Sequence, residues 1–169
     1  MNITTILSKK KKDSLALKKT LGILLKFKPL WLVRLSDNEL TNNLVRGLKS
    51  LPAGFVVYLK DAKTEILSNN VVVTWKLDNW VLSGFDFVVC DNKIKNINIY
   101  IEKWITPIII KENTISSNLI EFNPLKNEWN SFFYENSNEW DIFYSIVRYM
   151  ENYKFPFDNK NLVSNVLKV

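Results

Sequence analysis

The chain contains no histidine and a single cysteine among its 169 residues. Without histidine, Ser-His-Asp and Cys-His nucleophile systems are excluded, and so is any His-ligated metal site. The usual general base at neutral pH is missing as well. One cysteine, Cys90, cannot form an internal disulfide, and its position at the end of an apolar run indicates a buried thiol. We expect no metal site.

Long apolar runs and glycine-rich motifs are also missing. No apolar run reaches about 18 residues, so we expect no membrane span and no membrane partner. The chain has four glycines and neither a G-x-G-x-x-G motif nor a P-loop, so phosphate sites built from backbone are scarce. The segment MNITTILSKKKK carries its charges after the apolar stretch, the reverse of a secretory signal. We therefore expect a cytoplasmic protein.

What the chain does have is enough apolar material for a large core. Hydrophobic residues make up 47% and aromatics 13%, and the length fits one domain of ordinary size. Because four lysines follow one another from Lys9 to Lys12, we predict a basic flexible arm over residues 1–12. A single α/β domain is predicted over residues 13–169.

The formal net charge of +6 suits an anionic partner, such as a nucleotide diphosphate, a nucleic acid or a membrane surface. Much of this charge lies in Lys9 to Lys12, which is typical of a solvated terminus. A nucleic-acid footprint would spread Lys and Arg along one face with interleaved aromatics, and no such stripe is present. We expect no nucleic-acid partner, and we keep a basic nucleic-acid or membrane-surface binder as an alternative.

Short apolar runs alternate with amphipathic stretches along the chain. Such runs are typical of buried parallel strands, because both faces of the sheet are covered. We predict an α/β fold with a doubly wound, mainly parallel sheet flanked by helices, and a ligand site outside the carboxyl ends of the strands. The expected strands are LWLVRL at 30–35, GFVVYLK at 54–60, VVVT at 71–74, FDFVVC at 85–90, PIII at 107–110 and SFFY at 131–134.

The helices are predicted from caps and apolar periodicity. The first begins at Asp13 or Ser14, and the second is capped by Ser36 or Asp37. Three more cover residues 94–103, residues 138–153 and the segment after Pro156. The inward face of the helix over 138–153 is expected to include Phe143, Ile146, Val147 and Met150.

Seven segments carry a resemblance to a known family. They are KKKKDSLALKKTLGI (9–23), KPLWLVRLSDNEL (28–40), NNVVVTWKLD (69–78), GFDFVVCDN (84–92), KWITPIII (103–110), NEWNSFFY (127–134) and IFYSIVRYMENY (142–153). In this order and spacing, the chain resembles the C-terminal domain of starch and glycogen synthases, which are GT-B glycosyltransferases. The family's N-terminal acceptor domain is missing.

The resemblance implies a Rossmann-like GT-B C-terminal domain that binds a nucleotide diphosphate sugar, ADP- or UDP-glucose. It implies retaining glucosyl transfer to an α-glucan, with the nucleotide sugar as donor substrate and without a bound metal or other cofactor. A second chain or fragment would have to supply the acceptor domain.

The resemblance also assigns roles to individual residues. Arg34 falls where the family has an Arg that neutralises the leaving diphosphate, a role that suits a guanidinium. The partner Lys of that Arg falls at Glu39, where an acid would repel a diphosphate. Asp91 takes the place of a Glu near the donor sugar. Ile94 takes the place of a Gly whose N–H faces the phosphate, and its side chain would hinder that approach.

Five further positions are expected to contact the ligand through the same resemblance. They are Ile105, Thr106 and Pro107, which would shape the adjacent loop, and the Asn130–Ser131 turn. Other interpretations of the two main candidates are open: Arg34 also suits a surface ion pair, and Asp91 suits a turn or helix cap.

Three functions follow from these residues. The first is a glycosyltransferase lobe, incomplete or impaired alone. The second is a non-catalytic pseudo-glycosyltransferase that acts as a binding or interaction module, favoured by Glu39 and Ile94. The third is the basic binder already described.

Glycine is scarce where tryptophan is abundant. Average usage would give about 12 glycines, and the chain has four beside six tryptophans. Trp31, Trp104 and Trp129 fall where the family has Gly, while Trp75 and Trp80 follow turn-like contexts. One hypothesis is that some Trp codons are read as Gly in the source organism; another is decay in a pseudo-enzyme. In either case, a Trp at positive φ would strain its loop.

Overall fold

The structure, a computed structural model, describes residues 2–77, 82–94, 96–111, 119–123, 125–126, 128–166 and 168. Within these ranges, seven strands form one sheet in the order β3-β4-β2-β1-β5-β6-β7, and β3 alone pairs antiparallel. The strands are β1 (Leu30–Arg34), β2 (Gly54–Tyr58), β3 (Glu65–Ser68), β4 (Val71–Thr74), β5 (Phe87–Cys90), β6 (Thr106–Ile110) and β7 (Phe132–Tyr134). The helices are α1 (Ile3–Leu21), α2 (Asn38–Leu48), the 3-10 turn η1 (Leu82–Gly84), α3 (Asn98–Ile101), α4 (Glu139–Tyr153) and α5 (Pro156–Val166).

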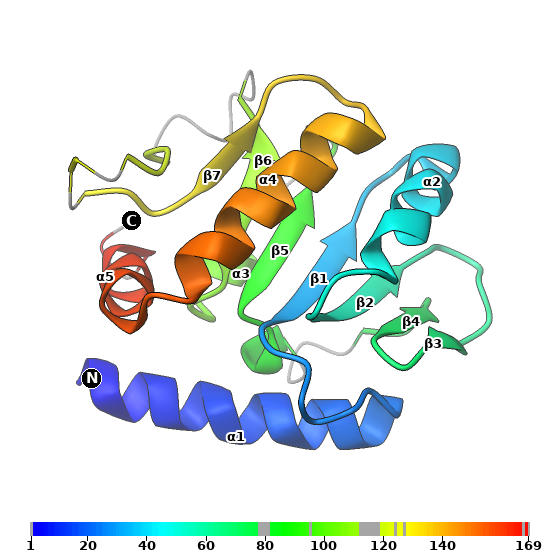
Figure 1. The fold of residues 1–169 in the computed structure, drawn as a ribbon, viewed down its shortest axis with the longest axis horizontal. Coiled ribbons are helices and arrows are strands. Elements are labelled where there is room, and N and C mark those ends of the chain that lie inside the picture. Colours follow the sequence, from blue (N-terminus) through cyan, green and yellow to red (C-terminus); the bar gives the residue numbers. More distant parts are fainter. Residues whose placement is uncertain are drawn as a thin grey trace.

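Helices cover both faces of the sheet, which confirms the predicted doubly wound α/β fold (Figure 1). On one face, α2 and α4 pack against the strand side chains that include Trp31, Val57 and Val89. On the other face, α1 and α3 pack against Leu32 and Val88. The strands are buried along nearly their whole length, as the continuous apolar runs predict.

The order in which strands are added to the sheet reverses between β1 and β5, which are parallel neighbours. The first three parallel strands are laid down from β1 outward through β2 to β4, and the later ones from β5 outward to β7. In register, Arg34 at the end of β1 lies beside Cys90 at the end of β5. This topological switch point is where open α/β sheets bind ligands, outside the carboxyl ends of the strands.

The expected flexible arm over residues 1–12 is wrong, because α1 begins at Ile3 and runs past the predicted helix start at Asp13. Asn2 caps this helix by accepting from the Thr4 N–H at 3.1 Å. Ile6 and Lys10 point inward and are 1% and 4% exposed. The run of four lysines hides this burial pattern, because one of them lies on the inner face of the helix.

Other elements follow the sequence with small differences. Asp37 and Asn138 cap α2 and α4 as predicted. The helix expected over residues 94–103 is the short α3, and the polar segment before β4 contains the edge strand β3, which the sequence did not predict. The buried face of α4 is Ile142, Ser145, Ile146, Tyr149 and Met150, so Phe143 and Val147 lie at its margin.

None of the helices in the described part of the chain has the length and apolarity needed to cross a membrane.

Candidate functional site

A cavity of about 520 Å³ opens at the carboxyl ends of β1, β2 and β5. The arrowheads of these strands point to the same edge of the sheet, next to the start of α2 (Figure 1). Arg34 and Tyr58 end two of these strands, Asp91 follows the third, and all three residues line the cavity. Lys60 and Lys93 line it as well.

Arg34 is held in place by two aromatic side chains. Its Nη1 donates to the Tyr100 hydroxyl at 2.9 Å, and its Cζ lies 5.1 Å from the Tyr58 ring centroid. Burial raises the pKa of the Tyr100 hydroxyl, which therefore stays neutral at physiological pH. Within the described residues, Arg34 has no carboxylate partner, so the surface ion pair considered from the sequence is not formed. Its remaining N–H donors are available to a ligand.

Asp91 is 7% exposed, and both of its carboxylate oxygens serve the fold. Oδ2 accepts from the Ser36 N–H and from the Ser36 hydroxyl, which ties the loop after β1 to the end of β5. Oδ1 accepts from the Lys93 N–H at 3.0 Å in an Asx turn. The interpretation of Asp91 as a turn cap is thus confirmed. The carboxylate positions the loop that carries Lys93.

The charges around the cavity favour an anion. Arg34, Lys60 and Lys93 contribute three positive charges, and Asp91 contributes one negative charge. A diphosphate carries several acceptor oxygens and needs donors of this kind, with an Arg fork as the strongest. Glu39 is exposed in the first turn of α2 and does not line the cavity, so its charge does not oppose an anion there directly.

Of the predicted ligand contacts, the structure brings Ile94 to the cavity together with Arg34 and Asp91. The placement of Ile105, Thr106 and Pro107 next to this site is wrong. These residues lie at the start of β6, and Thr106 is in register with Phe87 at the amino end of β5. Parallel strands begin at the edge opposite to their carboxyl ends, so these residues cannot shape a loop at the cavity.

Asn130 and Ser131 are also placed away from the cavity, immediately before β7. Asn130 Oδ1 accepts from the Ile120 N–H at 2.8 Å, and the Ser131 hydroxyl donates to the Ile120 carbonyl at 2.9 Å. Both are nearly fully buried. Their hydrogen bonds hold the segment that precedes β7.

Cys90 is fully buried beneath the cavity, as the sequence predicts. Burial, reinforced by the nearby Asp91 charge, raises the pKa of its thiol, so it is not a nucleophile. Tyr134 donates its hydroxyl to the Cys90 carbonyl at 2.7 Å. No group of three Cys, Asp or Glu side chains that would hold a metal ion occurs among the described residues.

Sequence reasoning missed Tyr58, Lys60, Lys93 and Tyr100 as members of the site. Tyr58 and Lys60 could have been found from the fold class alone, because they end and follow a strand of the predicted parallel sheet. Lys93 could have been found from its position two residues after Asp91. Tyr100 carries no signal in the sequence, since its contact with Arg34 depends on how α3 packs under the sheet.

No protein-family model matches the chain, and no curated protein matches it. Among solved structures, the chain is similar to the catalytic domain of starch synthase IV from Arabidopsis thaliana bound to ADP and acarbose, with 16% identity and a TM-score of 0.71. This match covers 95% of the chain and 39% of the synthase chain. The glycosyltransferase SnogD from Streptomyces nogalater matches with 14% identity and a TM-score of 0.54, over 88% of this chain and 40% of that one.

A third similar structure is UDP-GlcNAc 2-epimerase from Neisseria meningitidis bound to UDP-GlcNAc, with 11% identity and a TM-score of 0.55. It is matched over 98% of this chain and 49% of the epimerase chain. The chain therefore spans about 40% of the length of the matched transferases. At these identities the comparisons establish the fold: the chain has the Rossmann-like α/β fold of a GT-B glycosyltransferase domain.

Proposed function

We propose that this chain is the nucleotide-sugar-binding lobe of a glycosyltransferase resembling starch synthase, and that the diphosphate of ADP- or UDP-glucose binds in the cavity at the switch point. One observation carries the proposal: three cationic side chains from the ends of neighbouring strands line a cavity with one internally bonded acid.

Lys60 fills the role that Glu39 leaves open. When the bond between sugar and diphosphate breaks, negative charge develops on the leaving phosphate oxygens, and cations fixed beside them lower the barrier. Arg34 is fixed by Tyr58 and Tyr100, and Lys60 follows the neighbouring strand. The pair of cations that the resemblance assigns to positions 34 and 39 is thus proposed to be Arg34 and Lys60.

The similar structures support nucleotide binding more strongly than transfer. One is named with bound ADP and another with bound UDP-GlcNAc, and the second is an epimerase. A nucleotide ligand is common to both, whereas the reactions differ. Fold alone therefore supports the binding step, and the chemistry has to be argued from the site.

A non-catalytic binding module is the second candidate, and two features of the sugar end favour it. Both carboxylate oxygens of Asp91 accept hydrogen bonds from the loop, which gives this carboxylate a structural role. The Ile94 residue lines the cavity at the position where the family has a Gly. In this version the chain binds the nucleotide sugar, or the nucleotide alone, without transferring the sugar.

Transfer would also need an acceptor lobe, because the chain corresponds to about 40% of the starch synthase structure. We propose that the carboxyl edge of the sheet faces this acceptor lobe across the cavity, whether the lobe belongs to the same protein or to a separate one. Retaining transfer to an α-glucan and the cytoplasmic location are part of the same proposal.

Calorimetric titration of the full chain with ADP, ADP-glucose and UDP-glucose tests the binding step. Arg34→Gln and Lys60→Gln are each expected to weaken binding by at least about tenfold, since each removes a charge-assisted hydrogen bond. Lys63→Gln is the matched control, because Lys63 is exposed three residues from Lys60 and does not line the cavity.

Equal loss of affinity in Lys60→Gln and Lys63→Gln would show that general charge binds the nucleotide, and the proposed site would be rejected. A sugar-transfer assay with an acceptor lobe added as a second chain separates the two candidates. Transfer supports the glycosyltransferase, whereas tight binding of the nucleotide sugar without transfer supports the non-catalytic module.

A further inference from the structure

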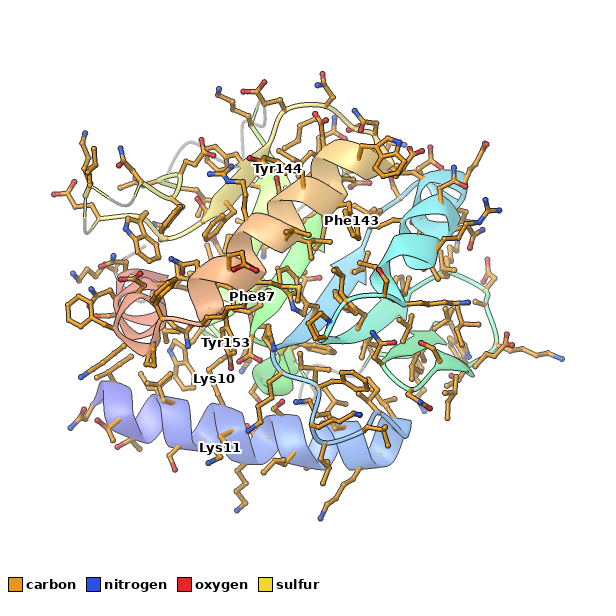
Figure 2. All side chains as sticks on the ribbon, in the orientation of Figure 1. Lys10, Lys11, Phe87, Phe143, Tyr144 and Tyr153 are labelled. Carbon is orange, nitrogen blue, oxygen red and sulfur yellow. The ribbon has the colours of Figure 1, made fainter. Side chains whose placement is uncertain are left out.

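A second cavity, of about 350 Å³, lies at the opposite, amino edge of the sheet. It is enclosed by α1, by Lys28 before β1, by Asp86 before β5, and by the junction of α4 and α5 at Tyr153 and Pro156. Figure 2 shows Lys10 rising from α1 toward the end of α4, where Tyr153 lies. Neither the resemblance nor the proposed function uses this cavity.

Positive charge dominates its lining. Lys10, Lys11, Lys18 and Lys28 contribute four positive charges, and Asp86 contributes one negative charge. The single acid is already engaged, since Asp86 Oδ2 accepts from the Leu30 N–H at 2.8 Å. The fold therefore gathers more cations around this cavity than its own acid neutralises.

Lys10 shows this imbalance most clearly. It is 4% exposed, and its ammonium donates to the Phe85 carbonyl. Burial lowers its pKa from the usual 10.5 to about 8, although Asp86 and Asp13 both act to raise it. Asp13 is itself bonded to the Ser83 hydroxyl at 2.8 Å. The carboxylates within reach are insufficient to stabilise the charge on Lys10.

Lys18 has no hydrogen-bond acceptor among the described residues, although the residue is 1% exposed. Its ammonium faces the cavity, where an acceptor would stabilise it, because charges in protein interiors are normally paired. Lys18 lines the cavity together with Lys10, which lies eight residues, or about two turns, earlier in α1. An anion in the cavity would supply the missing acceptor.

We propose that this cavity binds a small anion through its phosphate group, held by Lys10, Lys18 and Lys28. Several ammonium groups around one point match the many acceptor oxygens of a phosphate, which a single carboxylate does not match. The volume is at the small end of the range for ligand pockets, and Leu7 and Leu15 supply apolar wall. The site is separate from the nucleotide cavity, which lies at the carboxyl edge.

Inorganic phosphate is the probe, titrated into the full chain at constant ionic strength set with chloride and followed by amide NMR. Saturable shifts are expected at the amides of residues 10–21 and 85–87. Lys18→Met should remove them, since it keeps the length of the side chain and deletes the charge. Lys19→Met is the matched control, because Lys19 is the exposed neighbour on the same helix.

Lys28→Met gives a second variant that does not disturb the interior, since Lys28 is exposed at the mouth of the cavity. It is expected to weaken phosphate binding by about tenfold. The proposal is overturned if these amides show no saturable shift, or if Lys18→Met and Lys19→Met respond alike. Shifts confined to residues 34–38 and 91–94 would also overturn it, since they would place phosphate in the nucleotide cavity instead.

Discussion

At the scale of single residues, the buried lysines of α1 have consequences for stability. The pKa of Lys10 is about 8 in the folded protein against a usual 10.5, because burial outweighs the nearby acids Asp86 and Asp13. Burial also lowers the pKa of Lys18. Both groups therefore bind their protons less tightly in the folded state than in the unfolded state.

The contribution of Lys10 to the free energy of unfolding should rise as pH increases from about 8 toward 10. Below pH 8 the folded protein carries the full penalty of a buried charged Lys10, and deprotonation relieves it, by up to about 3 kcal/mol for a pKa lowered from 10.5 to about 8. Urea unfolding at pH 7, 8, 9 and 10 measures this. Lys10→Met should flatten the rise, whereas Lys9→Met, on the exposed side of the helix, should keep it. Identical pH profiles for the wild type and Lys10→Met would contradict the burial of Lys10, whereas a fall common to both would come from Cys90 and Tyr100, whose raised pKa values act in the opposite direction.

Two tryptophans that fall where the family has Gly, Trp31 and Trp104, lie in different environments, while Trp80 lies outside the described residues. Trp31 is fully buried in β1 and packs against Phe87 and Tyr149, with ring centroids 4.7 and 5.6 Å away. Trp104 has φ of 58°, in the left-handed region where Gly is favoured. The hypothesis of Trp codons read as Gly thus fits the backbone of position 104, whereas a Gly at position 31 would leave the centre of one core empty.

Trp31→Gly should lower the free energy of unfolding by at least about 4 kcal/mol, because it empties a filled core position and adds a Gly to a strand. Trp104→Gly should stay within about 1 kcal/mol of the wild type, since relief of the positive φ offsets the loss of a half-buried indole. Chemical unfolding of both variants measures the contrast. Equal and large losses would mean that position 104 requires an indole, and six UGG codons in the gene would end the codon hypothesis.

At the scale of elements, the end of β5 and the start of α2 are joined through one carboxylate. Asp91 Oδ2 accepts two hydrogen bonds from Ser36, beyond the ends of β5 and β1, where the strand order reverses. These bonds fix the floor of the cavity that contains Arg34, so Asp91 is expected to act as a positioning residue for Lys93 and the loop after β1.

Asp91→Asn should lower the free energy of unfolding by about 2 kcal/mol, because an amide cannot accept all the bonds that the carboxylate accepts. Ser36→Ala should cost about 1 kcal/mol, and the double variant should show coupling of about 1 kcal/mol in a double-mutant cycle. Nucleotide affinity should fall in parallel with stability. Full stability and nucleotide affinity with complete loss of sugar transfer would instead place Asp91 at the reacting sugar.

The strands were predictable from the sequence because they are buried on both faces and read as continuous apolar runs. The edge strand β3 was not, since its side chains are largely exposed and its sequence is polar. Arg34, Asp91 and Ile94 were assigned from the resemblance, and they line one cavity because β1 and β5 end at the same edge of the sheet. Ile105 to Pro107 were misplaced because they were assigned from the resemblance alone. They lie at the start of the parallel strand β6, and therefore at the amino edge of the sheet, away from the cavity at the carboxyl edge.

At the scale of the whole molecule, α1 decides how the charge of the chain is distributed. Lys10 and Lys18 are buried between α1 and the amino edge of the sheet, so the lysine run is not a uniformly solvated arm. A basic arm that binds nucleic acid or membranes by charge alone would need these groups exposed to the partner. Seven of the 23 Lys and Arg residues line two cavities at opposite edges of the sheet.

Ile6 tests whether the first turns of α1 belong to the folded domain. Ile6 is 1% exposed, so Ile6→Ala should lower the free energy of unfolding by about 2–5 kcal/mol, which corresponds to roughly 5–15 °C in Tm for a chain of this size. Thr5→Ala is the matched control on the exposed side of the same turn and should leave Tm nearly unchanged. If both variants melt like the wild type, residues 2–12 do not pack on the domain. The cavity lined by Lys10 and Lys18 would then lose one wall and two of its lysines, while the cavity that contains Arg34 would be unaffected, because none of its lining residues comes from α1.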